Sequence, residues 1–190
     1  MIINSEQEML NFGKKFAQEL TSDWNIAFRD RTKSKSNTAL TKRSASTGNF
    51  AGGTPAARRR EPSTVGETAK SGPVEAIVVE LIGDVGAGKT TFTRGLAEGL
   101  GIKEQITSPS FTISKSYALP NSTGRLIHYD FYRLPDPGLM LDDLRENLET
   151  PENIIIVEWG ESVADILPEN HLKIAIMYNE DGSRTINLQS

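Results

Sequence analysis

One stretch of eight residues constrains the fold of this chain more than any other. It matches the pattern G-x-x-x-x-G-K-[S/T] at every fixed position and consists of Gly83-Asp84-Val85-Gly86-Ala87-Gly88-Lys89-Thr90. Glycine has no Cβ, so the three glycines can take positive φ and let backbone N–H groups converge on an anion. The pattern therefore predicts a phosphate-binding loop between a strand and a helix.

The sequence predicts both flanking elements. Residues 76–82, before the loop, are a short apolar run rich in β-branched side chains, which is typical of a parallel strand covered on both faces. Residues 91–100 continue as a helix whose positive dipole end faces the phosphates, and Gly99 and Gly101 mark its end. A glycine turn beside an ordinary surface lysine is the alternative, but it would not need these neighbours. We therefore interpret the loop as a nucleotide phosphate site.

The loop and the residue after it supply the predicted nucleotide contacts. We expect Lys89 to reach the β and γ phosphates, and Thr90 to offer its hydroxyl to the metal ion that bridges them. The predicted cofactor-binding residues in this segment are Gly83, Val85, Gly86, Ala87, Gly88, Lys89, Thr90 and Thr91.

Composition bounds the class of protein. A length of 190 residues suits one domain, and a hydrophobic content of 37% is low enough to indicate that part of the chain does not pack. The absence of cysteine excludes disulfides and thiolate metal sites. No apolar run in the sequence approaches the ~18 residues of a membrane span, and the N-terminus lacks a signal-peptide pattern. We therefore expect a cytoplasmic protein.

The segment from about 21 to 73 differs in composition from the rest of the chain. It lacks periodicity, is rich in Ser, Thr, Gly and Pro, and holds 10 basic and 4 acidic side chains, whereas the whole chain holds 21 and 25. We interpret it as a disordered insertion in a single domain that spans residues 1–190. Such a basic segment can follow nucleic-acid phosphates, although charge-rich disordered loops are more often simply solvated.

The sequence before this insertion predicts a packing helix. Ser5-Glu6-Gln7-Glu8 fits a capping box, in which the Ser5 hydroxyl accepts from the N–H of Glu8 and the Glu8 carboxylate reaches back to the N–H of Ser5. Apolar residues at helical spacing are predicted to form the inner face of the helix: Met9, Phe12, Phe16 and Leu20.

Two predicted strands beyond the loop each carry a carboxylate. Residues 125–133 are expected to form a strand with His128, Asp130 and Tyr132 on one face. A buried carboxylate must be paired or metal-bound, so Asp130 suits either a magnesium site or an ion pair with a neighbouring arginine, Arg125 or Arg133. We interpret His128 as a hydrogen-bonded structural residue.

The second carboxylate follows the apolar run at 154–157, which predicts a buried parallel strand. This strand delivers Glu158 to its carboxyl end, where ligands of open α/β sheets bind. From the pattern alone, Glu158 and Asp130 are equally good candidates for holding a metal or positioning water. A solvated glutamate at the end of the strand is the alternative.

The segment 107–112 carries several hydroxyls around Pro109. In nucleotide hydrolases the segment after the phosphate helix often senses the metal and the γ phosphate, which makes Thr107, Ser108 and Ser110 candidates. A plain proline turn is the alternative. The remaining predicted elements are a short acidic helix at 139–148 and a closing hairpin formed by 172–177 and 185–188.

Four blocks of the sequence together resemble the bacterial TsaE (YjeE) family, the ATPase component of tRNA threonylcarbamoyladenosine synthesis. In chain order they are Gly83 to Thr91, Ser108-Pro109-Ser110-Phe111, His128-Tyr129-Asp130-Phe131-Tyr132-Arg133 and Glu158-Trp159. The resemblance covers roughly residues 1–20 and 74–190. It implies an α/β fold with a single P-loop NTPase domain, whose mainly parallel sheet is flanked by helices and closed by a C-terminal β-hairpin.

The resemblance also implies cofactors, partners and residue roles. It implies ATP with Mg²⁺, and association with the TsaD and TsaB subunits that transfer threonylcarbamoyl to adenosine in tRNA. The family's pattern assigns Asp130 to the magnesium and places Glu158 near the γ phosphate, with Trp159 beside the nucleotide. Lys89 and Glu158 are then the expected catalytic residues, and Thr90, Asp130 and Glu158 form the expected metal site.

Three positions depart from the family's pattern. Ser110 stands where threonine is usual, which preserves the hydroxyl, and Gly160 follows Glu158-Trp159 where proline is common. Met9 stands where the family's N-terminal helix usually offers a threonine near the nucleotide base.

Two other functions use the same loop. A small-molecule kinase would need an acceptor pocket and lid arginines, for which the nearby candidates are Arg125, Arg133 and Arg145. A module that binds ATP without turning it over, and recruits partners or tRNA, is the second alternative.

Overall fold

The computed structural model describes residues 1–22, 75–109, 112–120, 122–132, 134 and 136–189. The predicted insertion at 21–73 lies outside these residues except for Thr21 and Ser22, which belong to the N-terminal helix, residues 6–22. The disorder of the insertion and the extent of the domain therefore stay predictions.

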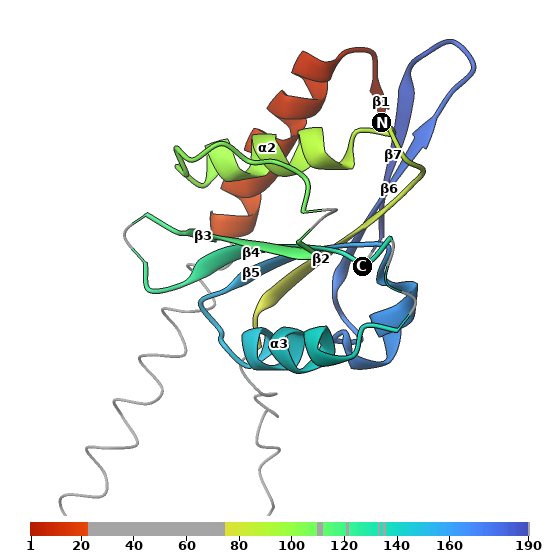
Figure 1. The fold of residues 1–190 in the computed structure, drawn as a ribbon. Coiled ribbons are helices and arrows are strands. Elements are labelled where there is room, and N and C mark those ends of the chain that lie inside the picture. Colours follow the sequence, from red (N-terminus) through yellow and green to blue (C-terminus); the bar gives the residue numbers. More distant parts are fainter. Residues whose placement is uncertain (23–74, 110–111, 121, 133, 135, 190) are drawn as a thin grey trace, which may run out of the picture. The chain divides into compact units, whose positions relative to one another are not determined.

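A seven-stranded sheet organises the described residues (Figure 1), with the strand order β1-β7-β6-β2-β5-β4-β3. Its four central strands pair in parallel: β6 (Leu172–Tyr178), β2 (Ile77–Ile82), β5 (Ile154–Glu158) and β4 (Arg125–Asp130). Three outer strands pair antiparallel with their neighbours: β1 (Ile2–Ile3), β7 (Arg184–Gln189) and β3 (Ser114–Ala118). The sheet is thus mixed, with a parallel centre and the predicted hairpin of β6 and β7.

Helices cover both faces of this sheet (Figure 1). The N-terminal helix and α2 (Lys89–Gly99) lie on one face, while α3 (Leu139–Leu148) and the 3₁₀ segment η1 (Gly160–Ile166) lie on the other. Alternate residues of β5 enter the two cores, since Ile154 and Ile156 pack with the first pair of helices and Ile155 and Val157 with the second. Burial on both faces explains why this strand is apolar throughout.

Most element boundaries agree with the sequence predictions, and α3 has the predicted bounds. Helix α2 begins at Lys89 and not at Thr91, because the last loop glycine leads directly into its first turn. Strand β4 ends at Asp130, short of the predicted Arg133. The N–H of Phe131 still donates to the carbonyl oxygen of Glu158 at 3.0 Å, but the chain then turns, so Tyr132 does not continue the strand face as predicted.

The N-terminal cap differs from its prediction in one contact. The N–H of Glu8 donates to Ser5 Oγ at 3.1 Å, as expected. The Glu8 carboxylate, however, accepts from the N–H of Asn4 at 2.7 Å and not from that of Ser5. The carboxylate thus satisfies a backbone donor one residue earlier, which also precedes the first turn of the helix.

The N-terminal helix and α2 approach each other very closely. A Cβ on Gly95 would lie 2.2 Å from the carbonyl oxygen of Leu10, and a Cβ on Gly13 would lie 2.4 Å from that of Phe92. The predicted inner face of the N-terminal helix is confirmed, since Met9 is buried and Phe12, Phe16 and Leu20 are partly buried against the same core. This contact fixes where α2, and therefore the loop before it, lies on the sheet.

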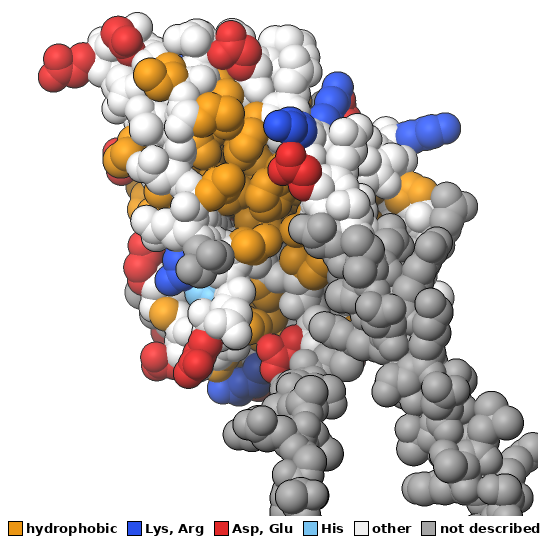
Figure 2. Space-filling model, turned by 180° about the vertical axis from the view of Figure 1, so that it is seen from behind, with side chains coloured by type: hydrophobic (Ala, Val, Ile, Leu, Met, Phe, Trp, Pro, Cys, Tyr) orange, Lys and Arg blue, Asp and Glu red, His pale blue; other side chains and the backbone are white. Residues whose placement is uncertain are grey.

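Apolar side chains gather on the side of the molecule that Figure 2 shows. By strand register, the exposed side chains of Ile82, Met177 and Ile2 share one face of the sheet.

None of the described helices is long and apolar enough to cross a membrane.

Candidate functional site

The phosphate loop connects the end of β2 to the start of α2. Its three glycines, Gly83, Gly86 and Gly88, have φ values of 151°, 84° and 114°, as their spacing predicted. A Cβ on Gly83 would lie 2.3 Å from the carbonyl oxygen of Ile176 on β6, so the loop also packs closely on the neighbouring strand. These conformations explain why glycine occupies the turning positions.

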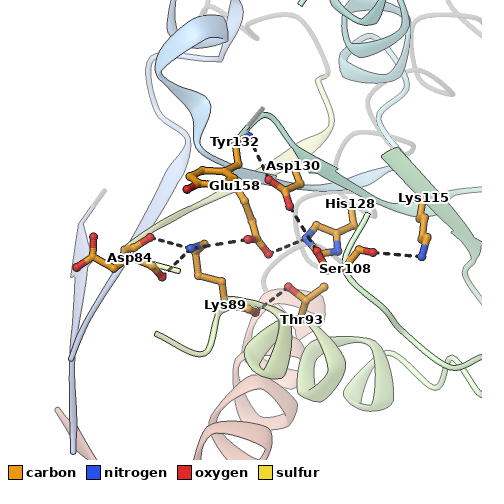
Figure 3. Close-up of polar contacts among 10 residues, drawn as sticks. Asp84, Lys89, Thr93, Ser108, Lys115, His128, Asp130, Tyr132 and Glu158 are labelled. Carbon is orange, nitrogen blue, oxygen red and sulfur yellow. Dashed lines mark hydrogen bonds and ion pairs between the residues drawn. The ribbon is translucent and has the colours of Figure 1, made fainter. Parts of the chain in front are cut away.

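The Lys89 side chain is buried and lies back across the loop (Figure 3). Its Nζ donates to the carbonyl oxygens of Gly83 at 2.7 Å and Asp84 at 3.0 Å. The same Nζ lies 3.9 Å from Glu158 Oε2 and 4.7 Å from the centre of the Trp159 ring. The lysine thus connects the loop to the end of β5.

The two candidate carboxylates lie side by side. Asp130 ends β4 and Glu158 ends β5, and the parallel register pairs them directly. Asp130 is 7% exposed and Glu158 is 4% exposed. Side chains alternate along a strand, so both carboxylates lie on the face of the sheet that packs against α2. The structure agrees with the prediction that Glu158 lies at the carboxyl end of its strand. Asp130 was predicted inside a strand that continues to Arg133, and it lies at the same edge because β4 ends there.

Hydrogen bonds hold Asp130 beside the segment at 107–109. Asp130 Oδ1 accepts from the N–H of Tyr132 at 3.1 Å, and Oδ2 accepts from Ser108 Oγ at 3.4 Å. Lys115, which the sequence reasoning missed, donates to the carbonyl oxygen of Ser108 at 3.2 Å and to the hydroxyl of Thr107. Of the candidate hydroxyls, that of Ser108 therefore reaches a site carboxylate and that of Thr107 binds a lysine.

Two residues that the sequence raised as candidates at this point lie outside the described residues, namely Ser110 and Arg133. The Arg125 side chain bonds to Ser116 on the neighbouring strand β3.

A cavity of about 280 Å³ brings most of the predicted site residues together. Its lining consists of Val85, Gly86, Gly88, Lys89, Thr90, Thr91, Ser108, Asp130, Tyr132, Glu158 and Trp159. Two predicted loop residues do not line it. Ala87 is buried in the core, and the carbonyl oxygen of Gly83 accepts a hydrogen bond from Lys89.

A second cavity of about 170 Å³ adjoins the first over the loop. Ser5, Glu6, Met9 and Arg184 line it together with Gly86, Gly88 and Thr91, which also line the first cavity. The sequence reasoning singled out Met9 at this position but missed Arg184. No local pattern marks that arginine, because only the position of β7 in the sheet brings it beside the N-terminal helix.

The turn after β5 places an aromatic side chain over the lysine. Trp159 has a φ of 58°, which is unusual for a bulky residue, and its ring centre lies 4.8 Å from that of Tyr132. Gly160 follows it and is buried. A Cβ at this position would lie 2.7 Å from Glu80 Oε1, so the glycine leaves room for that carboxylate.

Two histidine contacts join distant parts of the chain. His128 is fully buried and its Nε2 lies 2.8 Å from Glu158 Oε1 (Figure 3), which agrees with its interpretation as a hydrogen-bonded residue. His171 Nε2 lies 2.9 Å from Glu80 Oε2, and His171 Nδ1 lies 2.6 Å from the carbonyl oxygen of Pro168. The sequence reasoning missed the second contact, whose partners are 91 residues apart.

The fold and the site together define the class of this protein. A glycine-rich loop leaves a central parallel strand, enters a helix, and faces carboxylates at the carboxyl ends of two adjacent strands. This is the arrangement of an α/β protein with a phosphate-binding loop.

Comparison with known families narrows this class. Residues 56–186 match the family described as Threonylcarbamoyl adenosine biosynthesis protein TsaE, and the chain belongs to this family.

Several relatives carry the name "tRNA threonylcarbamoyladenosine biosynthesis protein TsaE". The relative from Haemophilus influenzae is 41% identical over 116 residues, which cover 60% of this chain and 70% of that protein. The relative from Streptomyces coelicolor is 40% identical over 99 residues, which cover 52% and 67%. A crystal structure of Bacillus subtilis YdiB is 38% identical, with a TM-score of 0.48, over 60% of this chain and 68% of that one.

Proposed function

We propose that this chain binds ATP with magnesium and hydrolyses it, as a partner-controlled switch in the synthesis of threonylcarbamoyladenosine in tRNA. One observation carries the proposal: the phosphate loop and the two carboxylates Asp130 and Glu158 line the same cavity. Membership in the TsaE family supports the connection with tRNA modification.

The loop would bind the phosphates through its backbone N–H groups and Lys89. The dipole of α2, which begins at Lys89, favours negative charge at this point. The Lys89 ammonium now donates to two loop carbonyls, and it would exchange these for phosphate oxygens. The exchange is favourable because a hydrogen bond between two charged groups is stronger than one to a neutral carbonyl.

The oxygen atoms around the cavity suit magnesium. Thr90 offers a hydroxyl and Asp130 a carboxylate, which are the hard ligands that Mg²⁺ prefers. Among the described residues, no group of three or more His, Asp and Glu side chains could hold a metal ion by itself. This donor set fits an ion that takes its remaining ligands from phosphate and water, as magnesium does in nucleotide sites. Bound magnesium would neutralise charge on the phosphates.

Glu158 would act on the γ-phosphate side of the site. Its Oε1 contacts His128, and its Oε2 faces Lys89 in the cavity. In phosphoryl transfer, positioning and electrostatic stabilisation provide most of the catalysis, and a fixed carboxylate can orient the attacking water. Glu158 thus has the more direct part in hydrolysis, and Asp130 the more direct part in metal binding.

The proposed partners are the TsaD and TsaB subunits of the tRNA-modifying complex, in which hydrolysis would rearrange the assembly. We propose that tRNA is contacted through these subunits or through the basic segment at 21–73. Family membership supports a role in this pathway.

The kinase alternative receives no support from Arg125 and Arg145, the two candidate lid arginines that the structure describes. Arg125 bonds to Ser116, and Arg145 is exposed and pairs with Asp142 on its own helix. Neither of these two arginines lines the cavity, where a lid would need them. A module that binds ATP without hydrolysing it would release no phosphate. Measuring phosphate release therefore distinguishes it from the proposed switch.

Two substitutions test the proposal. Lys89→Ala should abolish ATP binding, because it removes the cation from the phosphate site. Glu158→Ala should lower steady-state phosphate release, measured with TsaD and TsaB present, much more than it lowers ATP affinity. Glu161→Ala is the matched control, since Glu161 is an exposed carboxylate three residues further along. Unchanged turnover in both site variants would contradict the assignment.

A pull-down with and without ATP tests the partners. Retention of TsaD and TsaB that depends on ATP and is lost with Lys89→Ala is the expected result. Release of a phosphorylated metabolite in step with ADP would instead favour the kinase.

A further inference from the structure

We propose that His128 is a positioning residue that sets the orientation of the Glu158 carboxylate toward the nucleotide cavity. This inference rests on the proposed hydrolysis of ATP and assigns a role to a side chain that does not line the cavity.

His128 reaches Glu158 from the neighbouring strand. It lies opposite Ile156 of β5. The pair Asp130 and Glu158 comes two residues later on the same strands, so His128 lies on the same face of the sheet as both carboxylates. Its side chain is 0% exposed, and its ring is directed toward the Glu158 carboxylate (Figure 3). A nucleotide in the cavity would not touch it, so any effect on the reaction must pass through Glu158.

The two oxygens of the carboxylate have different neighbours. His128 Nε2 lies 2.8 Å from Oε1, and Lys89 Nζ lies 3.9 Å from Oε2. A glutamate side chain has three rotatable torsions, and an ammonium at this distance attracts either oxygen. The imidazole therefore holds one oxygen away from Lys89 and leaves the other directed into the cavity. Without it, the carboxylate is able to turn onto the lysine that the phosphates require.

The contact with Glu158 indicates which ring nitrogen donates a hydrogen bond. An ionised carboxylate only accepts hydrogen bonds, so Nε2 carries the proton and donates it to Oε1. His128 Nδ1 is buried and has no hydrogen-bond partner among the described residues. The contact with Glu158 is therefore the one polar contact of this side chain among the described residues.

A packing role does not explain a histidine here. The nearest strand residues on the same face, Leu126 on β4 and Ile156 on β5, are buried apolar side chains. An apolar side chain in the same place would avoid burying a polar nitrogen without a partner. The position of Nε2 beside a site carboxylate is the feature that an apolar side chain would lose.

Turnover and affinity separate this role from a structural one. His128→Leu should lower phosphate release by roughly tenfold to a hundredfold, since losing the group that orients a site ligand has effects of this size. ATP affinity, followed by Trp159 fluorescence in a Trp24→Phe background, should change much less. His128→Gln should recover most of the turnover, because its amide nitrogen can donate from nearly the same place. Equal loss in both variants, at unchanged unfolding midpoints, would overturn the inference.

A double mutant shows whether the effect passes through Glu158. In a Glu158→Ala background, His128→Leu should cause no further loss of turnover. Two losses that multiply would contradict a positioning role.

Nitrogen NMR gives a reading that does not depend on hydrolysis. The chain has 2 histidines, so His128 and His171 can be assigned from single substitutions. His128 should show a proton on Nε2 that is protected from exchange, and its signal should shift in Glu158→Ala. The opposite tautomer, or no response to that substitution, would refute the inference. If the NMR result holds while the unaltered chain releases no phosphate with its partners, the proposed hydrolysis fails and the orientation of Glu158 by His128 stands.

Discussion

Replacing Gly95 by alanine tests whether the crossing of two helices sets the position of the phosphate loop. Gly95 lies within α2, six residues after Lys89, and faces the N-terminal helix. An added Cβ would lie 2.2 Å from the carbonyl oxygen of Leu10 and 2.9 Å from its carbonyl carbon. Both are backbone atoms, so no side-chain rotation relieves the contact. Ordinary van der Waals contact begins at 3.4 Å, and the helices must therefore separate by about 1 Å.

The expected loss of stability follows from two opposing terms. Overpacking of this kind costs about 1–3 kcal/mol, and the rigid neighbours place Gly95→Ala at the upper end. Alanine stabilises a helix interior by about 1 kcal/mol relative to glycine. The net loss is then about 2 kcal/mol, which corresponds to a fall in Tm of about 4–8 °C for a protein of this size. ATP affinity should fall as well, because the loop itself packs closely on the N-terminal helix. A Cβ on Gly88 of the loop would lie only 3.3 Å from Met9 on that helix.

Urea unfolding and thermal melting measure this effect. Arg94→Ala is the control, since Arg94 is the preceding residue of α2, has an exposed side chain and makes a surface pair with Glu6. It should change stability by less than about 0.5 kcal/mol. An unchanged or raised urea midpoint for Gly95→Ala would refute the reasoning, because it would show that the helices separate at no cost.

Two further substitutions test buried polar contacts. Tyr129 donates to Asp143 Oδ2 at 2.6 Å and accepts from Asn147 Nδ2 at 3.0 Å, so Tyr129→Phe should lower the free energy of unfolding by about 1–2 kcal/mol. Burial, and then the Asp143 carboxylate, raise the pKa of Tyr129. The difference between wild type and variant should therefore be constant below the unfolded-state pKa of about 10 and should shrink as pH rises above it; a difference that grows there would contradict this sign. His171→Phe leaves Glu80 with Lys173 Nζ at 3.6 Å and should cost about 1.5–3 kcal/mol in urea unfolding, whereas His171→Gln should cost less. An unchanged midpoint for His171→Phe would mean that the lysine alone compensates the buried carboxylate.

Local patterns predicted the main parts of the site because its geometry is largely local. Three glycines at fixed spacing permit a turn with positive φ that other residues would resist, and the structure has that turn. The apolar runs before Gly83 and Glu158 predicted strands buried on both faces, and they lie next to each other in the centre of the sheet. Glu158 was expected at the carboxyl end of its strand, and β5 ends there.

The residues that sequence reasoning missed share a different property. Lys115, His171 and Arg184 have no motif around them. Lys115 contacts the segment beside Asp130 and Arg184 lines the second cavity, while His171 contacts Glu80 on β2, and in each case the partner is distant in sequence or lies on another element. The end of β4 was also misplaced, because the alternation of residue types continues past Asp130 while the backbone turns.

The sequence by itself determined the loop, the strand and helix on either side of it, and the glutamate that ends β5. These features depend on backbone conformation and side-chain alternation over a few residues. Only the tertiary structure decided that His128 reaches Glu158, that Lys89 lies against Trp159, and that a second cavity opens beside Met9. Those contacts depend on which strands are neighbours and on how closely two helices pack, and no short stretch of sequence contains that information.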